Sequence, residues 1–476
     1  MRRAARRLLG GASALALSMA ALPAQANGRF PATNQFVVMP GKPTQLMVRS
    51  TFGLLVSSDQ GKNWDWICEQ AALGPNGAAG TEDPGVALTA SGAIIVAASE
   101  GLIVSPDTGC SWVNADPTFF VDVAVRPNAP HEAIALEAMF DGEGSTESFR
   151  NQLYVTTDDG AHWTPYGVPL DPTFIGDTVE VSASDPNRVY VTGEKSTSTE
   201  MAALFTSTNG GATWTENPVP ILPQNEEAAF IAAVDPTNPD RVYLRTGDHT
   251  GLQASRLLVT DNAGMTFTER YAGTGPMQGF ALSPDGSTVY IGFGRAATDG
   301  DVSDGLQVAS TTNFAFKQRS NVIVQCLALS GATLYACAPE LSGFVLGAST
   351  DDGATFKTLL HLCDIRGPLA CGSSTTDTKV DCTSFWSGSD SLPGQGVAEQ
   401  LGDPCSTPPD AGEPSADGGP SPPAPDAGKT AGTPASTGAG CATAPKSGDW
   451  YGWYGVGAGV LVSAALMWGR RKRRGP

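Results

Sequence analysis

The octet STDDGATF (Ser349 to Phe356) follows the pattern Ser/Thr-x-Asp-x-Gly-x-x-Trp/Phe, which also occurs in SSDQGKNW (Ser57 to Trp64), SPDTGCSW (Ser105 to Trp112) and TTDDGAHW (Thr156 to Trp163). Three imperfect copies lie in phase with these: STNGGATW (Ser207 to Trp214), TDNAGMTF (Thr260 to Phe267) and ASTTNFAF (Ala309 to Phe316). The closing aromatic residues are 48, 51, 51, 53, 49 and 40 residues apart. A period of about 50 residues that contains several short strands is typical of a β-propeller blade.

Each residue type in the octet suits a tight turn. A short Asp or Asn side chain accepts hydrogen bonds from nearby backbone N–H groups, glycine tolerates a positive φ, and the aromatic side chain covers the blade. The sixth copy is degenerate, because Thr311 and Asn313 stand where Asp and Gly belong. We expect a structural role for the third residue of the other octets: Asp59, Asp107, Asp158, Asn209, Asn262 and Asp351.

These octets resemble the Asp-box, or BNR, repeat family, and the resemblance covers residues 30–363. It implies box turns that lie on one face of a disc and join the third strand of each blade to the fourth. Short apolar and β-branched runs separated by Pro, Asn, Asp or Gly surround each octet. We therefore predict an all-β fold, a seven-bladed β-propeller of four-stranded blades, over residues 27–363. The seven units are nearly whole, so the sequence does not indicate how the ring closes.

The two ends of the chain carry export and membrane signals. Residues 1–26 combine four arginines, an apolar stretch and Ala24-Gln25-Ala26, which are the features of a secretory signal peptide. Residues 450–469 are apolar and long enough for one C-terminal transmembrane helix, followed by a basic cytoplasmic tail at residues 470–476. Residues 407–449 are rich in Pro, Ala and Gly and predict a disordered stalk.

Cys441, the apolar span and the arginine cluster together resemble the C-terminal sorting signals of myxobacterial surface proteins. That resemblance implies cleavage of the tail near Cys441 and retention on the outer surface. A plain single-pass membrane anchor is the alternative. Either interpretation predicts an exported, membrane-anchored protein whose propeller lies outside the cell.

The other eight cysteines are typical of an oxidising compartment. In QCLALSGATLYAC, a two-residue turn at Gly331-Ala332 places Cys326 opposite Cys337, which predicts a disulfide between them. A small cysteine-containing module is predicted at residues 364–406, directly after the last blade. Four cysteines would form its two disulfides: Cys363, Cys371, Cys382 and Cys405. They allow three pairings, between which the sequence does not choose.

The charge of the exported part is strongly acidic. Without the four arginines of the leader and the five basic residues of the tail, 20 Lys and Arg remain against 48 Asp and Glu. Nucleic acid and anionic lipid are poor partners for such a surface. The charge favours solubility or cation binding.

The loops that join second to third strands lie opposite the box turns, and four of them are long: residues 139–151, 193–201, 247–255 and 294–305. Long loops on a rigid scaffold often carry function. We predict ligand-binding residues on these loops and at their ends: Glu143, Arg150, Glu194, Lys195, Arg245, Asp248, His249 and Arg295. The alternative is that the loops are only solvated.

In the blade-six loop, TDGDVSDG offers Asp299, Asp301 and Asp304 as candidate calcium ligands, and no cofactor is expected to be required. The run departs from the EF-hand loop, because Asp304 stands where glycine is needed and Ser310 where glutamate is needed. A solvated acidic loop is the alternative that these departures favour.

Propellers with Asp-boxes include sialidases, xyloglucan-cleaving glycosidases, sortilin-type receptors and photosystem assembly factors, so the fold alone does not decide function. Sortilin-type receptors resemble this chain in organisation, with a propeller, a cysteine module and one membrane span. We predict an extracellular propeller that binds a protein or glycan and is more consistent with a binding protein than with an enzyme. The alternative is a sialidase-like or xyloglucanase-like glycoside hydrolase that uses the same face.

Overall fold

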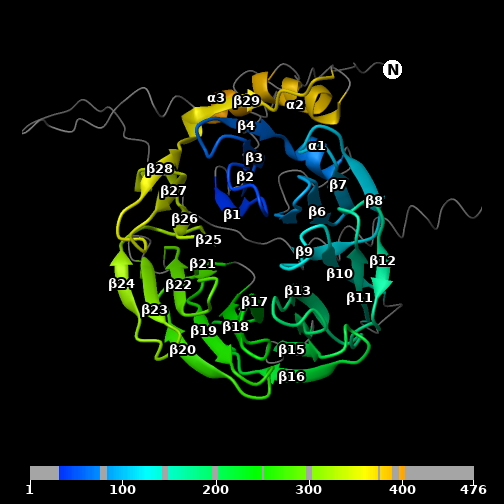
Figure 1. Cartoon of the computed structure of the whole chain (residues 1–476), viewed down its shortest axis with the longest axis vertical. Coiled ribbons are helices and arrows are strands. Elements are labelled where there is room, and N and C mark those ends of the chain that lie inside the picture. Colours follow the sequence, from blue (N-terminus) through cyan, green and yellow to red (C-terminus); the bar gives the residue numbers. More distant parts are fainter. Residues whose placement is uncertain are drawn as a thin grey trace, which may run out of the picture.

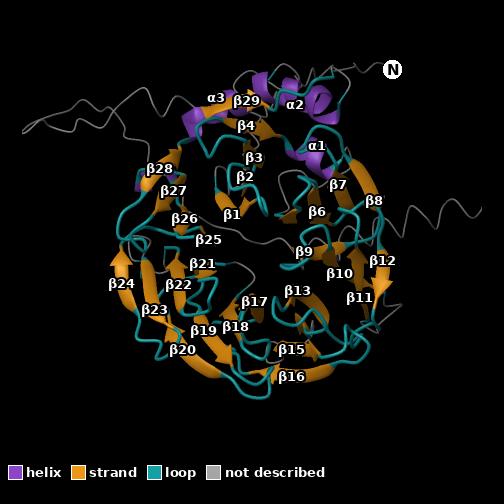
Figure 2. Ribbon diagram, viewed as in Figure 1, coloured by secondary structure: helices purple, strands orange, loops and turns teal. Residues whose placement is uncertain are grey.

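The computed structural model describes residues 32–74, 83–141, 148–195, 202–248, 251–295, 303–373, 376–388 and 396–401. Their strands form seven sheets around a central axis (Figures 1 and 2). The predicted all-β, seven-bladed propeller with four-stranded blades is confirmed. The leader, the stalk, Cys441, the apolar span and the basic tail lie outside the described residues. Within the described ranges, no helix is long and apolar enough to cross a membrane.

Each blade is antiparallel, and its strands follow one another from the axis outward (Figure 1). The strands of blades 1 to 4 are β1 (Thr33–Val38), β2 (Leu46–Ser50), β3 (Gly53–Ser57), β4 (Trp64–Ile67), β5 (Gly85–Leu88), β6 (Ile94–Ala98), β7 (Gly101–Ser105), β8 (Val113–Asp116), β9 (Phe120–Val125), β10 (Ala133–Phe140), β11 (Phe149–Thr156), β12 (Thr164–Tyr166), β13 (Ile175–Val181), β14 (Val189–Glu194), β15 (Ala202–Ser207) and β16 (Thr215–Val219).

The remaining three blades have the same plan. Their strands are β17 (Ala228–Val234), β18 (Val242–Gly247), β19 (Arg256–Thr260), β20 (Thr268–Ala272), β21 (Met277–Leu282), β22 (Thr288–Phe293), β23 (Leu306–Ser310), β24 (Lys317–Ser320), β25 (Cys326–Ser330), β26 (Thr333–Cys337), β27 (Leu346–Ser349) and β28 (Lys357–Leu360).

The hydrophobic core lies between neighbouring blades. Leu136 of blade 3, for example, packs in one buried cluster with Val179 and Val191 of blade 4. Phe174 and Phe205 of the same cluster meet edge to face, with ring centroids 5.2 Å apart. Because each sheet buries its faces only against its neighbours, every blade depends on the two beside it.

The ring closes where the chain returns to blade 1. After blade 7, the strand β29 (Ile365–Pro368) pairs in parallel with β4 and forms the outer edge of the first sheet (Figure 1). Arg366 adds two hydrogen bonds to the carboxylate of Asp65, at 3.0 and 2.6 Å. A strand from the end of the propeller sequence therefore becomes the fifth strand of the first blade.

Short helices accompany this closing strand, which the all-β prediction did not include. The helix α1 (Glu69–Leu73) follows blade 1, whereas α2 (Asp377–Ser387) and α3 (Val397–Leu401) follow β29. Two short 3₁₀ helices, η1 (Glu340–Ser342) and η2 (Leu362–Asp364), precede β27 and β29. In Figure 2 the purple helices α2 and α3 lie beside blade 1 at the rim of the disc.

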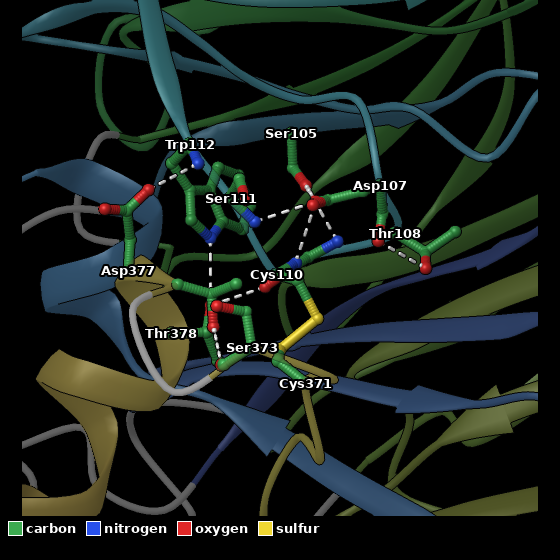
Figure 3. Close-up of a disulfide and its surroundings, with 12 residues drawn as sticks. Ser105, Asp107, Thr108, Cys110, Ser111, Trp112, Cys371, Ser373, Asp377 and Thr378 are labelled. Carbon is green, nitrogen blue, oxygen red and sulfur yellow. Dashed lines mark hydrogen bonds between the residues drawn. A yellow bond between two sulfur atoms is a disulfide. The ribbon is translucent and has the colours of Figure 1, made fainter.

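Disulfides fasten this C-terminal segment to the first two blades. Cys382 is bonded to Cys68, and Cys371 is bonded to Cys110 (Figure 3). The expectation that Cys371 and Cys382 pair within a separate cysteine module is therefore wrong, because both sulfurs reach back to the propeller. Cys363 is also in a disulfide. The predicted bond between Cys326 and Cys337 is present in blade 7.

The start of α2 sits on the box turn of blade 2 (Figure 3). The backbone N–H of Trp112 donates to Asp377 at 2.7 Å, and its indole N–H donates to the hydroxyl of Thr378 at 3.1 Å. The Thr378 hydroxyl in turn donates to the carbonyl of Gly109. The box turn thus serves as an internal docking point for the C-terminal segment.

Removing the two closing disulfides, by changing Cys68, Cys110, Cys371 and Cys382 to Ser, is expected to lower the free energy of unfolding by about 9 kcal/mol, because each bond closes a long loop. Removing only Cys326–Cys337, whose partners are 11 residues apart, is expected to cost about 3 kcal/mol. Denaturant titration of the variants measures both values. Equal losses would contradict a ring that depends on the long-range bonds.

Candidate functional site

Each box turn uses its own polar side chain internally. In blade 1, Asp59 accepts hydrogen bonds from the backbone N–H groups of Lys62 at 3.1 Å and Asn63 at 3.0 Å. In blade 4, the amide oxygen of Asn209 accepts the corresponding bond from Thr213 at 2.9 Å. Asn thus replaces Asp in the turn without loss of the acceptor, which gives these residues a structural role.

The same contacts lower the pKa of box carboxylates. Hydrogen bonding by the Asn63 side chain is the main reason that the pKa of Asp59 falls to about 2. The backbone N–H and hydroxyl of Thr355 lower the pKa of Asp351 to about 2. Each turn also needs left-handed backbone, with φ of 56° at Asp352 and 80° at Gly353 in blade 7.

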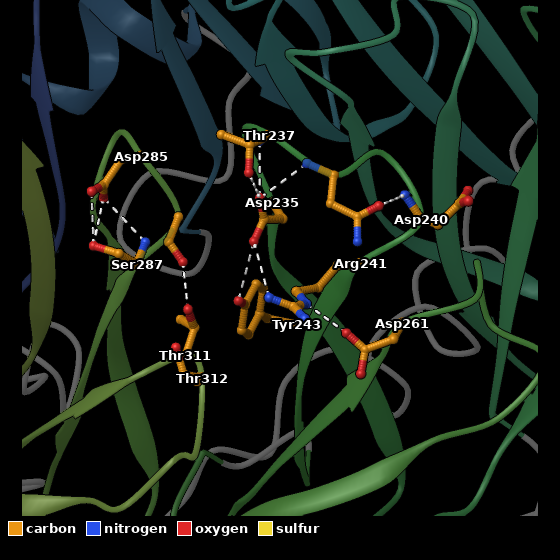
Figure 4. Close-up of polar contacts among 12 residues, drawn as sticks. Asp235, Thr237, Asp240, Arg241, Tyr243, Asp261, Asp285, Ser287, Thr311 and Thr312 are labelled. Atoms are coloured by element: carbon orange, nitrogen blue, oxygen red, sulfur yellow. Dashed lines mark hydrogen bonds and ion pairs between the residues drawn. The ribbon is translucent and has the colours of Figure 1, made fainter.

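Ion pairs connect the hairpins on the box face of blades 4 and 5. The carboxylate of Asp235, only 1% exposed, lies 3.7 Å from Arg241, which contacts Asp261 at 2.5 Å (Figure 4). Arg188 of blade 4 pairs with Asp240 of blade 5 at 2.6 Å. These charges hold the hairpins and box turns together.

Side chains also join the inner strands around the axis. The backbone N–H of Val179 in β13 donates to Asp122 of β9 at 2.9 Å, and that of Ile231 in β17 donates to the hydroxyl of Thr178 at 3.0 Å. The inner edge of a sheet has no strand partner, so its N–H groups need such acceptors.

Two carboxyl groups of neighbouring inner strands share this environment. Burial, followed by the nearby charge of Asp122, raises the pKa of Glu180 to about 8. Burial also raises the pKa of Asp122 to about 6, although the N–H groups of Val179 and Val123 oppose the shift. Both shifts favour the protonated forms of these carboxyl groups.

The long loop of blade 3 begins and ends at a buried ion pair. Arg150, whose side chain is 41% exposed, contacts Glu137 at 2.5 Å, and the Glu137 side chain is fully buried. Burial and the charge of Glu137 raise the pKa of the nearby Tyr154.

The predicted residues at the loops of blades 4 and 5 lie mostly in the scaffold. Glu194 is 6% exposed and Asp248 is 9% exposed. The ammonium of Lys195 lies 5.0 Å from the ring centre of Phe174. Asp248 accepts a hydrogen bond from the backbone of Gln253 at 3.1 Å, which fixes the end of its loop.

Arg245 lies between blades 5 and 6. Its guanidinium is 4.7 Å from the ring centre of Phe230 and donates to the carbonyl of Met277 at 3.1 Å. Burial lowers the pKa of Arg245, and Asp248 partly offsets this effect. Arg245 therefore contributes to packing between blades, whereas the prediction placed it on the loop face.

In blade 6, Arg295 is exposed, and Asp304 accepts hydrogen bonds from the N–H and hydroxyl of Thr274 at 2.6 and 3.0 Å. The other predicted loop residues lie outside the described residues: Glu143, His249, Asp299 and Asp301. In the part of the chain that the structure describes, no group of three Asp, Glu, His or Cys side chains is arranged to hold a metal ion.

Sequence reasoning missed two acidic residues of the scaffold, the buried Glu226 and the half-buried Glu180. Glu226 is 1% exposed and contacts Arg256 at 2.6 Å and the hydroxyl of Thr246 at 2.5 Å. Nothing in the run QNEEAAF distinguishes Glu226 from its neighbour Glu227. Glu180 did carry a signal, because it lies inside the apolar run TVEV.

A family model described as "Sortilin, neurotensin receptor 3" matches residues 100–221, which is less than half of the chain. No curated protein matches the chain at a significant level. The matched residues run from blade 2 to the end of blade 4, so the similarity concerns the boxed repeats.

Several solved structures resemble the fold. An ancestral GH74 enzyme is 17% identical over 69% of this chain, which covers only 38% of that enzyme, with a TM-score of 0.33. Hydrazine synthase of Kuenenia stuttgartiensis is 10% identical over 69% of this chain and 97% of its own, with a TM-score of 0.48. YCF48 from Cyanidioschyzon merolae is 12% identical over 64% of this chain and 92% of its own, with a TM-score of 0.41. At such identities the likeness concerns the fold alone.

Changing Asp59 and Asp351 to Asn is expected to preserve the turns, because Asn209 accepts the same bond in blade 4, and to lower stability slightly at pH 7. The stability of the variant should also fall less than that of the wild type as the pH is lowered to 2. The lowered pKa values mean that the box carboxylates stabilise the fold above about pH 4 and lose this contribution as the pH falls to about 2. Thermal melts between pH 7 and 2 measure the effect, and unchanged acid sensitivity would contradict it.

Glu180→Gln is expected to raise the melting temperature at pH 8 to 9 by about 1–3 °C and to leave it unchanged near pH 4. A raised pKa means that the carboxyl destabilises the fold progressively as the pH rises from 4.5 to about 8. Melting curves across this range test the prediction, with the exposed Glu216→Gln as control. A variant less stable than the wild type at pH 8 would refute it.

Proposed function

We propose that this chain is an exported β-propeller that binds an extracellular protein or glycan through the long-loop face of blades 3 to 6. The observation that carries the proposal is that contacts with the scaffold fix the ends of these long loops. Arg150 contacts the buried Glu137. Asp248 accepts a hydrogen bond from the backbone of Gln253, and Asp304 accepts one from the backbone of Thr274. Loops with fixed ends on a rigid ring favour specific binding, since less entropy is lost when they meet a ligand.

The other described surfaces are less suited to this role. The box turns use their acidic side chains internally, and the hairpins beside them in blades 4 and 5 are paired with one another. Exposed groups at the ends of the long loops include Asp141 and Arg295. The face thus offers charges of both signs to a polar partner.

The disulfides support an oxidising compartment. Residues 1–26 would direct export, residues 407–449 would form a stalk, and residues 450–469 would anchor the chain or form part of a sorting signal processed near Cys441. Nucleic acid is not a proposed partner, since the exported part is strongly acidic. Calcium binding by Asp299, Asp301 and Asp304 remains a separate hypothesis, tested by calcium titration.

The combined change of Asp141 and Arg295 to Ala is expected to weaken ligand binding by at least about tenfold and to leave the melting temperature unchanged, because both side chains are exposed. The full-length chain is incubated with sialylated and β-glucan oligosaccharides and with extracellular proteins from its own cells. Mass spectrometry then identifies what stays bound and whether oligosaccharides are cleaved.

The matched control is Arg245→Ala, which is expected to lower stability because this side chain packs between blades 5 and 6. Affinity that is unaltered in the Asp141 and Arg295 variant would contradict the placement of the site. Cleavage of oligosaccharides would favour the alternative function, a glycoside hydrolase that uses the same face.

A further inference from the structure

An open groove lies at the boundary between blades 6 and 7, away from the loops of blades 3 to 5. Its volume is about 470 Å³, within the range of roughly 300–1,000 Å³ typical of small-ligand sites. The link from β24 to β25 forms one side, beginning at Asn321. The other side consists of the turn before β27, including Ser342, and the box of blade 7 from Ala354 to Phe356.

The groove lies where the repeat is least regular. Blade 6 carries the degenerate box, in which Phe314 rather than the preceding two residues adopts a positive φ of 50°. The step from the sixth to the seventh closing aromatic residue is the shortest in the series, 40 residues.

Two aromatic and two aliphatic side chains line the apolar part of the groove. The rings of Phe344 and Phe356 lie 5.4 Å apart and are inclined by 35°. Gly347 lets the Phe344 ring approach closely, because a Cβ at this position would come within 2.9 Å of it. Beside the groove, the Leu341 side chain is 89% exposed. Phe344 is only 7% exposed, so the half-buried Phe356, Val322 and Ile323 supply the apolar surface that a ligand can reach.

The polar part of the groove is neutral. Asn321 and Thr355 are exposed and supply an amide and a hydroxyl, and Ser342 is half-buried. None of the described residues that line the groove is charged, although the whole chain has a formal net charge of −19. An ionic ligand would find no counter-charge here, whereas a ligand rich in hydroxyl groups would find donors and acceptors.

We propose that the groove between blades 6 and 7 binds a neutral oligosaccharide, with aromatic and aliphatic side chains against the sugar ring and neutral polar groups on its hydroxyls. The volume fits roughly one or two sugar rings. Asn321 of the groove adjoins Gly305 at the end of the blade-6 long loop, so the groove lies beside the long-loop face. The residues that line the groove differ from those proposed on that face, so the proposal does not depend on that face being a binding site.

The test uses the purified full-length chain and a panel of neutral cello-, manno- and malto-oligosaccharides, with sialylated oligosaccharides as charged comparators. Ala354 is exposed in the groove, and Ala354→Trp would fill it. The matched control is Ala212→Trp, since Ala212 is the exposed residue at the same position of the blade-four box and also precedes Thr and an aromatic residue. Calorimetry measures binding, and thermal melts confirm folding.

We expect a neutral oligosaccharide to bind the wild type and the Ala212→Trp variant alike, and to bind Ala354→Trp at least about tenfold more weakly. If Ala354→Trp does not fold, Ser342→Trp replaces it, with the same expectation. The proposal is overturned if no neutral oligosaccharide binds, if only sialylated ones bind, or if the groove-filling variant binds as well as its control. Loss of binding only in the Asp141 and Arg295 variant would move the sugar to the long-loop face.

Discussion

Contact between the first and last blades is the constraint on which the rest of the structure depends, because every sheet buries its faces only against a neighbour. The Phe36 ring of blade 1 packs 4.7 Å from the Tyr335 ring of blade 7. The indole N–H of Trp64 donates to the carbonyl of Leu359 at 3.0 Å. Parallel pairing of β29 with β4 stabilises this contact between blades 1 and 7 from the outer edge of blade 1. Two disulfides bond the segment that follows β29 to blades 1 and 2. If blades 1 and 7 separated, both would expose apolar faces.

The local features of this fold could be predicted from the sequence because their causes lie within a few residues. Asp59, Gly61 and Trp64 act inside one turn. Cys326 and Cys337 face each other across one hairpin. The closing bonds are different, since their partners are 314 and 261 residues apart and no local pattern links them. For the same reason, the sequence of β29 does not identify it as a strand, because its pairing partner β4 lies far away in the sequence.

In the candidate site, too, local features could be predicted from the sequence and long-range packing could not. Loop lengths located four long connections on one face, but they could not show which charged residues point into the scaffold. Arg245 lies in β18, one residue after the buried Leu244, and its side chain fills the space between two blades. Glu194 ends a strand that is buried along its whole length. The groove between blades 6 and 7 is lined by three segments that are separate in the sequence, so it could not be predicted from the repeat pattern.

The long-range disulfides also affect how the protein is made. During synthesis from the N-terminus, Cys68 and Cys110 emerge long before Cys382 and Cys371, their partners 314 and 261 residues further along the chain. An oxidase that joins cysteines in order of appearance would link Cys68 to Cys110 and trap blades 1 and 2 before the ring exists. Efficient maturation therefore depends on late oxidation or on an isomerase that exchanges such early bonds, a step that takes seconds to hours. The yield of folded protein is thus tied to the thiol chemistry of the compartment that receives it.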